Sequence, residues 1–379
     1  MPDNTVSVVR GTDKFASFSE LLSLTKFDEA LSQAQAASGK TKEAYRIVIK
    51  PNMMVFVSRN GYEATVTDWT LVEYLVDHII AMGFTNIALC EAQHDVGRMF
   101  KNHNVAFVAD QIGYRPQGRY RIADLTLESQ PYSYEYVDKG KSKLWKDVVG
   151  TTWRDADYRI SFAKLKTHEH DWMTLTVKNI YGCFAASDKV QRYHMKNEVW
   201  EVTSRSLRNF PIHFAFLDGW IASDGFQGYK VPRPKPLQML MGGANAIAVD
   251  MEAFKRAGLD SRRSRILNRC VEQTSSGIYP DYTVAGDTTS MYKDICDWTN
   301  IEDGTVQAIN HMEEVYIGWA LINLKPGAEY VDYKMFPPKN IGSRLVVWAS
   351  KKFDAIFKLT WLYKKWYGKP DPAKRPAQH

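Results

Sequence analysis

The fold is decided by YRIVIK (residues 45–50), WTLVEYLVDHIIAM (69–82) and NIALC (86–90). The first and third stretches are short and rich in β-branched and apolar residues, which is typical of buried strands. The middle stretch has apolar residues three and four positions apart and stops at Gly83, as an amphipathic helix does. A strand, a helix and a second strand in this order predict a parallel βαβ unit.

The same alternation continues along the chain as far as residue 257. Apolar runs at 158–163, 213–217 and 238–241 predict further strands, whereas 172–180 and 246–257 predict further helices. We therefore predict an α/β fold with a mostly parallel sheet and helices on both faces. An irregular insertion and a C-terminal amphipathic helix are added to it.

A chain of 379 residues is long enough for two or three domain-sized units. We predict an N-terminal α/β subdomain at 1–150, with an irregular insertion that begins near residue 111. A second α/β subdomain at 151–330 carries a motif of lysines and histidines. Residues 331–379 form the amphipathic helix and a disordered tail.

Composition is that of an ordinary soluble globular protein with a mild excess of positive charge. The hydrophobic fraction is 45%, the charged fraction is 24%, and the net charge is +6. Such a mild excess of positive charge suits an anionic metabolite or a lipid surface. The sequence has no helix-turn-helix, zinc-finger or RNA-recognition signature, so we expect no nucleic-acid partner.

The four cysteines are scattered, without a CxxC pair, so no intrinsic iron–sulfur cluster is expected. Scattered, unpaired cysteines are typical of proteins in a reducing compartment. The N-terminus, MPDNTVSVVRG, does not resemble a signal peptide, and no apolar run approaches the roughly 20 residues of a membrane span. We expect a cytoplasmic protein, either free or peripheral to a membrane.

The stretch AKLKTHEHDWMTLTVKNIYG (163–182) concentrates charged side chains directly after a predicted strand. Parallel α/β sheets bind ligands beyond the carboxyl ends of their strands, and other polar residues follow the predicted strands nearby. Fixed positive charge at such a place predicts a site for a small anion. The predicted substrate-binding residues are Lys50, Asn52, Lys164, Lys166, Thr167, Lys178, Asn179 and Asp218.

The histidines of this stretch have two interpretations. As catalytic groups, His168 and His170 would transfer protons, because imidazole titrates near neutrality, and Glu91 would act with them. As ligands, His168 and His170 would bind a divalent metal together with His194. Glu91 also has a structural interpretation, as the acceptor of a buried ion pair with Lys164.

The segment at 343–367 predicts a helix that is apolar around most of its circumference. An apolar surface of this width has to be covered. The helix could pack on the protein's own domain or on a partner, such as a second copy in a homodimer. As a basic, Trp-rich interfacial helix, it could also lie on an anionic membrane.

These residues resemble domain-of-unknown-function family number 362, whose members are often described as iron–sulfur-associated proteins. The resemblance covers roughly residues 45–260. Its motif positions are Lys50 to Asn52, Glu91, Ala163 to His168, Lys178 to Gly182, His194, Asp218-Gly219 and Ala248 to Asp250. The family is distantly similar in layout to the catalytic subunit of lactate racemase.

The chain departs from the family pattern in two ways. It has no ferredoxin-like run of cysteines, and Asp68-Trp69 replaces the His-Pro that commonly opens the first helix. The resemblance therefore implies neither cluster-based electron transfer nor a role for that histidine.

We predict an enzyme that acts on a small carboxylate or phosphate metabolite by histidine acid/base or metal-assisted chemistry. Isomerases, racemases, lyases and metal-dependent oxidoreductases all fit this description. The alternative is a non-catalytic accessory protein that binds a cofactor or a lipid-linked anion and docks through its C-terminal helix. A further alternative is a redox protein fed by a separate ferredoxin.

Overall fold

The computed structural model describes residues 4–54, 56, 59, 62–94, 97, 99–137, 146–168, 171–194, 199–224, 234–292 and 334–357. The strands are β1 (Thr5–Arg10), β2 (Ile47–Pro51), β3 (Ile87–Glu91), β4 (Arg121–Asp124), β5 (Ser129–Ser133), β6 (Lys146–Gly150), β7 (Tyr158–His168), β8 (Trp172–Thr174), β9 (Phe214–Ser223), β10 (Pro234–Lys235), β11 (Met239–Gly243) and β12 (Thr283–Gly286).

The helices flank these strands in sequence. They are α1 (Lys14–Leu24), α2 (Phe27–Ser38), α3 (Trp69–Ala81), α4 (Val105–Ile112), α5 (Thr151–Arg154), α6 (Thr176–Asn179), α7 (Val199–Asn209), α8 (Ala246–Arg256), α9 (Arg265–Ser275) and α11 (Ile341–Phe357). Turns of 3₁₀-helix are η1 (Tyr62–Ala64), η4 (Ile180–Cys183) and η6 (Ser261–Arg263), and η5 (Val190–His194) is a turn of π-helix.

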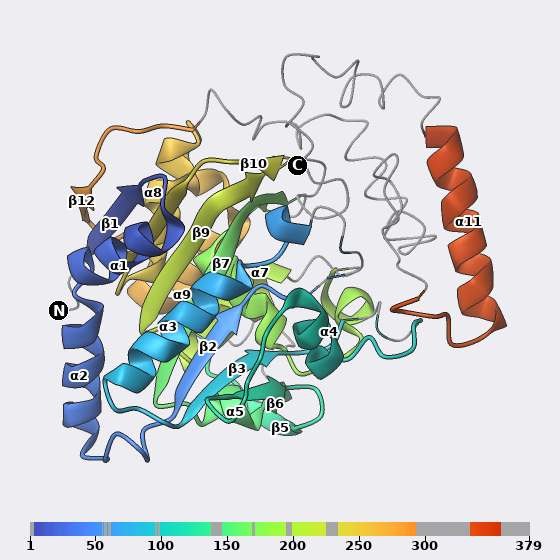
Figure 1. The fold of residues 1–379 in the computed structure, drawn as a ribbon, viewed down its shortest axis with the longest axis horizontal. Coiled ribbons are helices and arrows are strands. Elements are labelled where there is room, and N and C mark those ends of the chain that lie inside the picture. Colours follow the sequence, from blue (N-terminus) through green and yellow to red (C-terminus); the bar gives the residue numbers. More distant parts are fainter. Residues whose placement is uncertain are drawn as a thin grey trace.

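One large mixed sheet organises the described part of the chain (Figure 1). Its strand order is β12-β1-β11-β9-β7-β2-β3-β4, with β8 added to β7 and β10 added to β9. The run from β9 to β4 is parallel throughout, whereas β11 pairs antiparallel with both of its neighbours. The predicted mostly parallel α/β sheet is confirmed.

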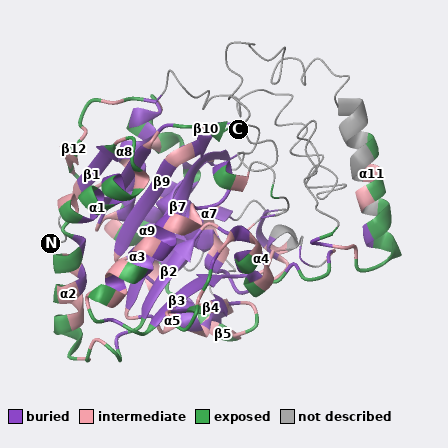
Figure 2. Ribbon diagram, viewed as in Figure 1, coloured by how far each residue is buried: buried purple, intermediate pink, exposed green. Residues whose placement is uncertain are grey.

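Helices cover both faces of the sheet, and its central strands β2, β3, β7 and β11 are buried between them (Figure 2). Side chains of β7 alternate between two apolar clusters, as the two-residue repeat of a strand requires. Ile160 and Phe162 pack with α1 to α4, whereas Ala163 and Leu165 pack with α6 to α9.

The predicted βαβ unit has the expected form. β2 pairs in parallel with β3, and α3 connects them. Asp68 caps α3, because its Oδ1 accepts a hydrogen bond from the Thr70 amide at 2.9 Å. β2 also pairs in parallel with β7, so the ends of β2, β3 and β7 lie side by side.

The helix predicted at 172–180 is wrong in its first half. The chain reverses after β7, and β8 returns antiparallel along it, with Thr174 opposite Lys166. Trp172 has a φ of 65°, a left-handed conformation that a continuous helix does not contain. The helix begins only at Thr176 and runs four residues before η4.

The predicted subdomains share the sheet. Residues 1–150 supply β1 to β4, and residues 151–330 supply β7 to β12. The segment at 111–152 contributes β4 to the sheet and also forms the separate hairpin of β5 and β6.

The C-terminal helix α11 follows a segment that contacts the N-terminal half of the chain. The Lys101 amide donates to the Pro337 carbonyl at 2.8 Å, and Phe336 is fully buried against His103 and Phe107. The predicted tail and the predicted helix beyond Phe357 lie outside the described residues.

Every helix in the described ranges is too short or too polar to cross a bilayer.

Candidate functional site

A cavity of about 80 Å³ lies beyond the carboxyl ends of β2, β3 and β7. This is the edge of a parallel sheet at which ligands usually bind. Among the described residues, its walls carry four lysines, three histidines and one carboxylate. They are formed by Lys50, Asn52, Met54, Glu91, His94, Lys166, His168, Thr174, Lys178, Asn179, Tyr181, Gly182, Lys189 and His194.

A buried ion pair forms part of the cavity wall. Lys50, in β2, and Glu91, at the end of β3, are joined at 2.9 Å, and each side chain is 1% exposed. Glu91 also accepts hydrogen bonds from the Met53 and Ala92 amides, both at 3.3 Å. Buried charges require such compensation, because each loses its hydration. The predicted pair of Glu91 with Lys164 is therefore wrong, and Lys50 is its partner.

Asn179 connects the ion pair to α6. Its Nδ2 donates to the Lys50 carbonyl at 2.7 Å and to Ser161 Oγ at 3.2 Å. Its Oδ1 accepts from Lys50 Nζ at 3.3 Å and from Asn52 Nδ2 at 3.5 Å. One amide side chain thus links β2, β7 and the loop after β2.

Asp250 of α8 fixes the start of α6. Its carboxylate accepts hydrogen bonds from the Thr176 amide at 2.8 Å, the Val177 amide at 2.9 Å and Thr176 Oγ1 at 2.5 Å. These amides belong to the first turn of a helix, where donors have no partner within the helix. Asp250 thereby positions the helix that carries Lys178 and Asn179.

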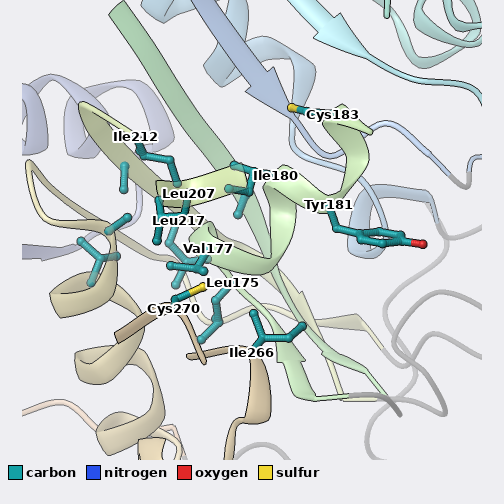
Figure 3. Packing of buried hydrophobic residues seen from close by; sticks show 14 of the residues in the cluster. Leu175, Val177, Ile180, Tyr181, Cys183, Leu207, Ile212, Leu217, Ile266 and Cys270 are labelled. Atoms are coloured by element: carbon teal, nitrogen blue, oxygen red, sulfur yellow. The ribbon is translucent and has the colours of Figure 1, made fainter. Parts of the chain in front are cut away.

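Apolar packing holds the opposite side of this helix. Leu175, Val177, Ile180 and Tyr181 belong to the cluster that includes α7 and α9, but the Tyr181 ring points away from the other three side chains (Figure 3). The Tyr181 hydroxyl lies 3.0 Å from His194 Nδ1, and Lys178 Nζ lies 5.9 Å from the centre of the Tyr181 ring. Tyr181 therefore contacts a histidine and a lysine of the cavity wall.

Two further lysines of the wall are held by oxygen atoms. Lys166 Nζ donates to Asn52 Oδ1 at 3.0 Å and to the Thr65 carbonyl at 2.5 Å. Lys189 Nζ donates to the Gly182 carbonyl at 3.1 Å. Burial, followed by repulsion from Lys178, Lys164 and Lys50, lowers the pKa of Lys166 well below its usual value.

Three predicted substrate-binding residues are not in the cavity wall. Lys164 and Asp218 form a buried ion pair with each other at 2.9 Å. Asp218 also accepts from the Asp68 amide at 2.8 Å, next to the cap of α3. Thr167 is fully buried and does not line the cavity. Lys50, Asn52, Lys166, Lys178 and Asn179 are brought together as predicted.

Of the predicted histidines, His168 and His194 both line the cavity. His170 lies outside the described residues. No cluster of three or more potential metal ligands occurs within the described ranges. Asp171 is buried away from the cavity, where it accepts from Ser264 Oγ and, at 3.2 Å, from the Ile266 amide.

The predicted site residues leave out several residues of the wall, among them Thr174, Tyr181, Lys189 and His94. Thr174 was hidden because 172–180 has the pattern of a helix, whereas its strand pairing places it opposite Lys166. Lys189 follows the Lys-Asn-x-x-Gly motif by seven residues, and only its spatial position reveals it.

Gly182 is a position of the cavity wall at which a side chain would clash with the buried ion pair. A Cβ atom there would lie 2.3 Å from Glu91 Oε1 and 2.6 Å from Lys50 Cε. We expect Gly182→Ala to lower the free energy of unfolding by about 1–3 kcal/mol, because the buried pair has to move. Urea titration of the full chain measures this.

The control is Gly342→Ala in α11, where the nearest atom to a Cβ is Asn340 Oδ1 at 3.4 Å. It should leave the unfolding free energy unchanged or raise it slightly, since Ala favours a helix. Equal stability of Gly182→Ala and the wild type would contradict the assigned packing.

The chain matches one known protein family and one solved structure. Among curated proteins, no sequence matches this chain. A crystal structure of a Thermotoga maritima protein, solved by structural genomics, is 11% identical, with a TM-score of 0.26. The match spans 50% of this chain and 50% of that one. The sequence pattern of the domain of unknown function DUF362 matches residues 47–255, which include every motif position of the cavity. This chain therefore belongs to the DUF362 family.

Proposed function

We propose that this protein is an enzyme that binds a small anionic metabolite in the cavity and moves a proton with its histidines. The concentration of lysine and histidine side chains around a space of about 80 Å³ carries the proposal. Lysines placed this close repel one another, which costs free energy as long as no anion is bound. A carboxylate or phosphate would relieve that repulsion.

Lys166 and Lys178 are the proposed anion-binding groups. Both side chains are buried, and Lys178 is among the groups that lower the pKa of Lys166. A bound anion has the opposite effect and favours the charged form of both lysines. Lys50 is paired with Glu91, so its proposed role is to hold the ends of β2 and β3 together at the cavity wall.

His168 and His194 are the proposed proton-transfer groups. Both line the cavity, and contact with the Tyr181 hydroxyl holds the His194 ring. Glu91 is proposed as a positioning residue, because its carboxylate is bound to Lys50 and to backbone amides. Two histidines beside an anion support isomerase, racemase or lyase chemistry.

The metal-assisted alternative is less well supported by these walls. A divalent cation beside Lys166, Lys178 and Lys189 would be repelled, whereas an anion would be attracted. We therefore place proton transfer by histidine ahead of metal catalysis.

We expect His168→Gln to reduce turnover of the metabolite by about 10²–10⁴-fold, the usual contribution of a general acid or base. Anion affinity and thermal stability should stay near the wild-type values. Turnover is measured on hits from a screen of carboxylate and phosphate metabolites, with binding followed by calorimetry.

His78→Gln is the matched control, because His78 pairs with Asp28 on the surface and lies outside the cavity. It should turn over substrate at the wild-type rate. Full activity of His168→Gln would remove that histidine from the mechanism.

We expect anion affinity to fall as pH rises. Lys166 binds the anion as an ammonium group, and its pKa in the free protein is lowered. Binding above that pKa therefore takes up a proton, which weakens binding up to tenfold per pH unit. Calorimetry of acetate and inorganic phosphate in two buffers of different ionisation enthalpy measures the uptake.

Lys166→Met should bind more weakly and show less proton uptake. Lys26→Met is a control, since Lys26 lies at the start of α2 and does not line the cavity. Equal proton uptake by Lys166→Met and the wild type would contradict a role for Lys166 in this linkage.

A second candidate is an accessory protein that docks through α11. Ile341, Leu345 and Trp348 lie three or four residues apart and are 74%, 60% and 61% exposed. Lys352 Nζ lies 5.9 Å from the centre of the Trp348 ring, so a cation extends the same face. A basic, Trp-bearing helix face supports binding to an anionic membrane.

If this candidate is correct, full-length protein floats with vesicles that contain phosphatidylserine, and Leu345→Ser/Trp348→Ser does not. The double variant leaves the docked segment at 334–340 intact. Vesicles of phosphatidylcholine alone are the control for charge. Flotation of neither protein would leave α11 without a membrane role.

A further inference from the structure

We propose that the anion held in the cavity is a phosphate group, and that Thr174 Oγ1 donates a hydrogen bond to it. This inference rests on the proposed function, because it specifies the ligand of the same site. It is carried by a buried hydroxyl without a partner, placed among lysines.

Thr174 is 3% exposed, and its Oγ1 is buried without a hydrogen-bond partner. Buried hydroxyl groups are normally hydrogen-bonded, because losing contact with water costs free energy. Thr174 lines the cavity, so a ligand there can accept the missing bond.

Strand pairing aims this hydroxyl at the charged groups. Thr174 is the register partner of Lys166, and Trp172 is the register partner of His168. Residues directly opposite in an antiparallel pair share one face of the sheet, as do residues two apart. Thr174, Lys166 and His168 therefore project from the same face of β7 and β8.

The charge of the wall favours phosphate over carboxylate. Lysine ammonium groups and the Thr174 hydroxyl share the cavity wall, and both kinds of group donate hydrogen bonds. A carboxylate offers about four lone-pair sites and a single charge. A phosphate monoester offers three strong acceptor oxygens and a charge of about −1.5 to −2 at neutral pH.

The type of cation and the size of the cavity agree with this choice. The cationic lining residues in the described ranges, apart from histidine, are all lysines. Lysine is a compact point charge that binds phosphate, whereas planar bidentate recognition of a carboxylate favours arginine.

A cavity of about 80 Å³ has the volume of two to three waters at roughly 30 Å³ each. It therefore admits one phosphate group, and the organic part of a phosphomonoester would lie outside.

The test is calorimetric titration of the full chain at pH 7 with inorganic phosphate, methyl phosphate and acetate. The wild type should bind both phosphates at least tenfold more tightly than acetate. Thr174→Val keeps the shape of the side chain and removes the hydroxyl, so phosphate affinity should fall about tenfold or more. Thr174→Ser restores the hydroxyl and should bind within threefold of the wild type.

Ser7→Ala is the matched control, because Ser7 Oγ is a second buried hydroxyl without a hydrogen-bond partner and lies in β1, outside the cavity. It should leave phosphate affinity unchanged. Thermal unfolding of each variant separates loss of binding from loss of the fold.

Tighter binding of acetate than of phosphate would overturn this inference and leave the proposed anion-binding function standing. Unchanged phosphate affinity in folded Thr174→Val would also overturn it. Absence of binding for all three anions would overturn both proposals.

Discussion

The buried ion pair of Lys50 and Glu91 is the interaction on which the site depends. It joins the ends of two parallel strands at 2.9 Å with almost no exposure. Removing one partner of such a pair typically costs about 3–5 kcal/mol, because the other charge stays buried. Asn179 attaches to Lys50, and Gly182 has no side chain because the pair occupies that space. The pair thus explains why Lys-Asn-x-x-Gly has this spacing.

Around this pair, the protein carries more cationic side chains in one small space than stability alone would favour. Lys166 has a lowered pKa, which is the electrostatic signature of burial among like charges. Proteins tend to break local rules of stability at functional sites and to compensate elsewhere. Here the compensation comes from the carboxylate of Asp250, which anchors α6, and from the apolar packing of Val177 and Ile180.

A second ion pair shows why charge in a motif does not by itself define a site. Lys164 and Lys166 are two residues apart in one strand, yet Lys164 pairs with Asp218 next to the cap of α3. A register shift separates the two lysines where β7 pairs with β9. Such irregularities redirect side chains near functional edges of sheets. The lysine that enters the cavity is Lys166, and the other one secures β9.

The sequence by itself determined the βαβ unit, the mostly parallel sheet and the edge at which polar residues gather. Periodicity and strand ends are local properties, so they are readable without coordinates. Only the tertiary structure decided which charges pair: Glu91 with Lys50, and Lys164 with Asp218. It also decided that β8 reverses along β7, which brings Thr174 to Lys166. These pairings join residues 41 and 54 positions apart, or depend on one left-handed residue, Trp172. The periodicity of apolar residues reports local secondary structure, so it contains neither the long-range pairings nor the left-handed conformation of one residue.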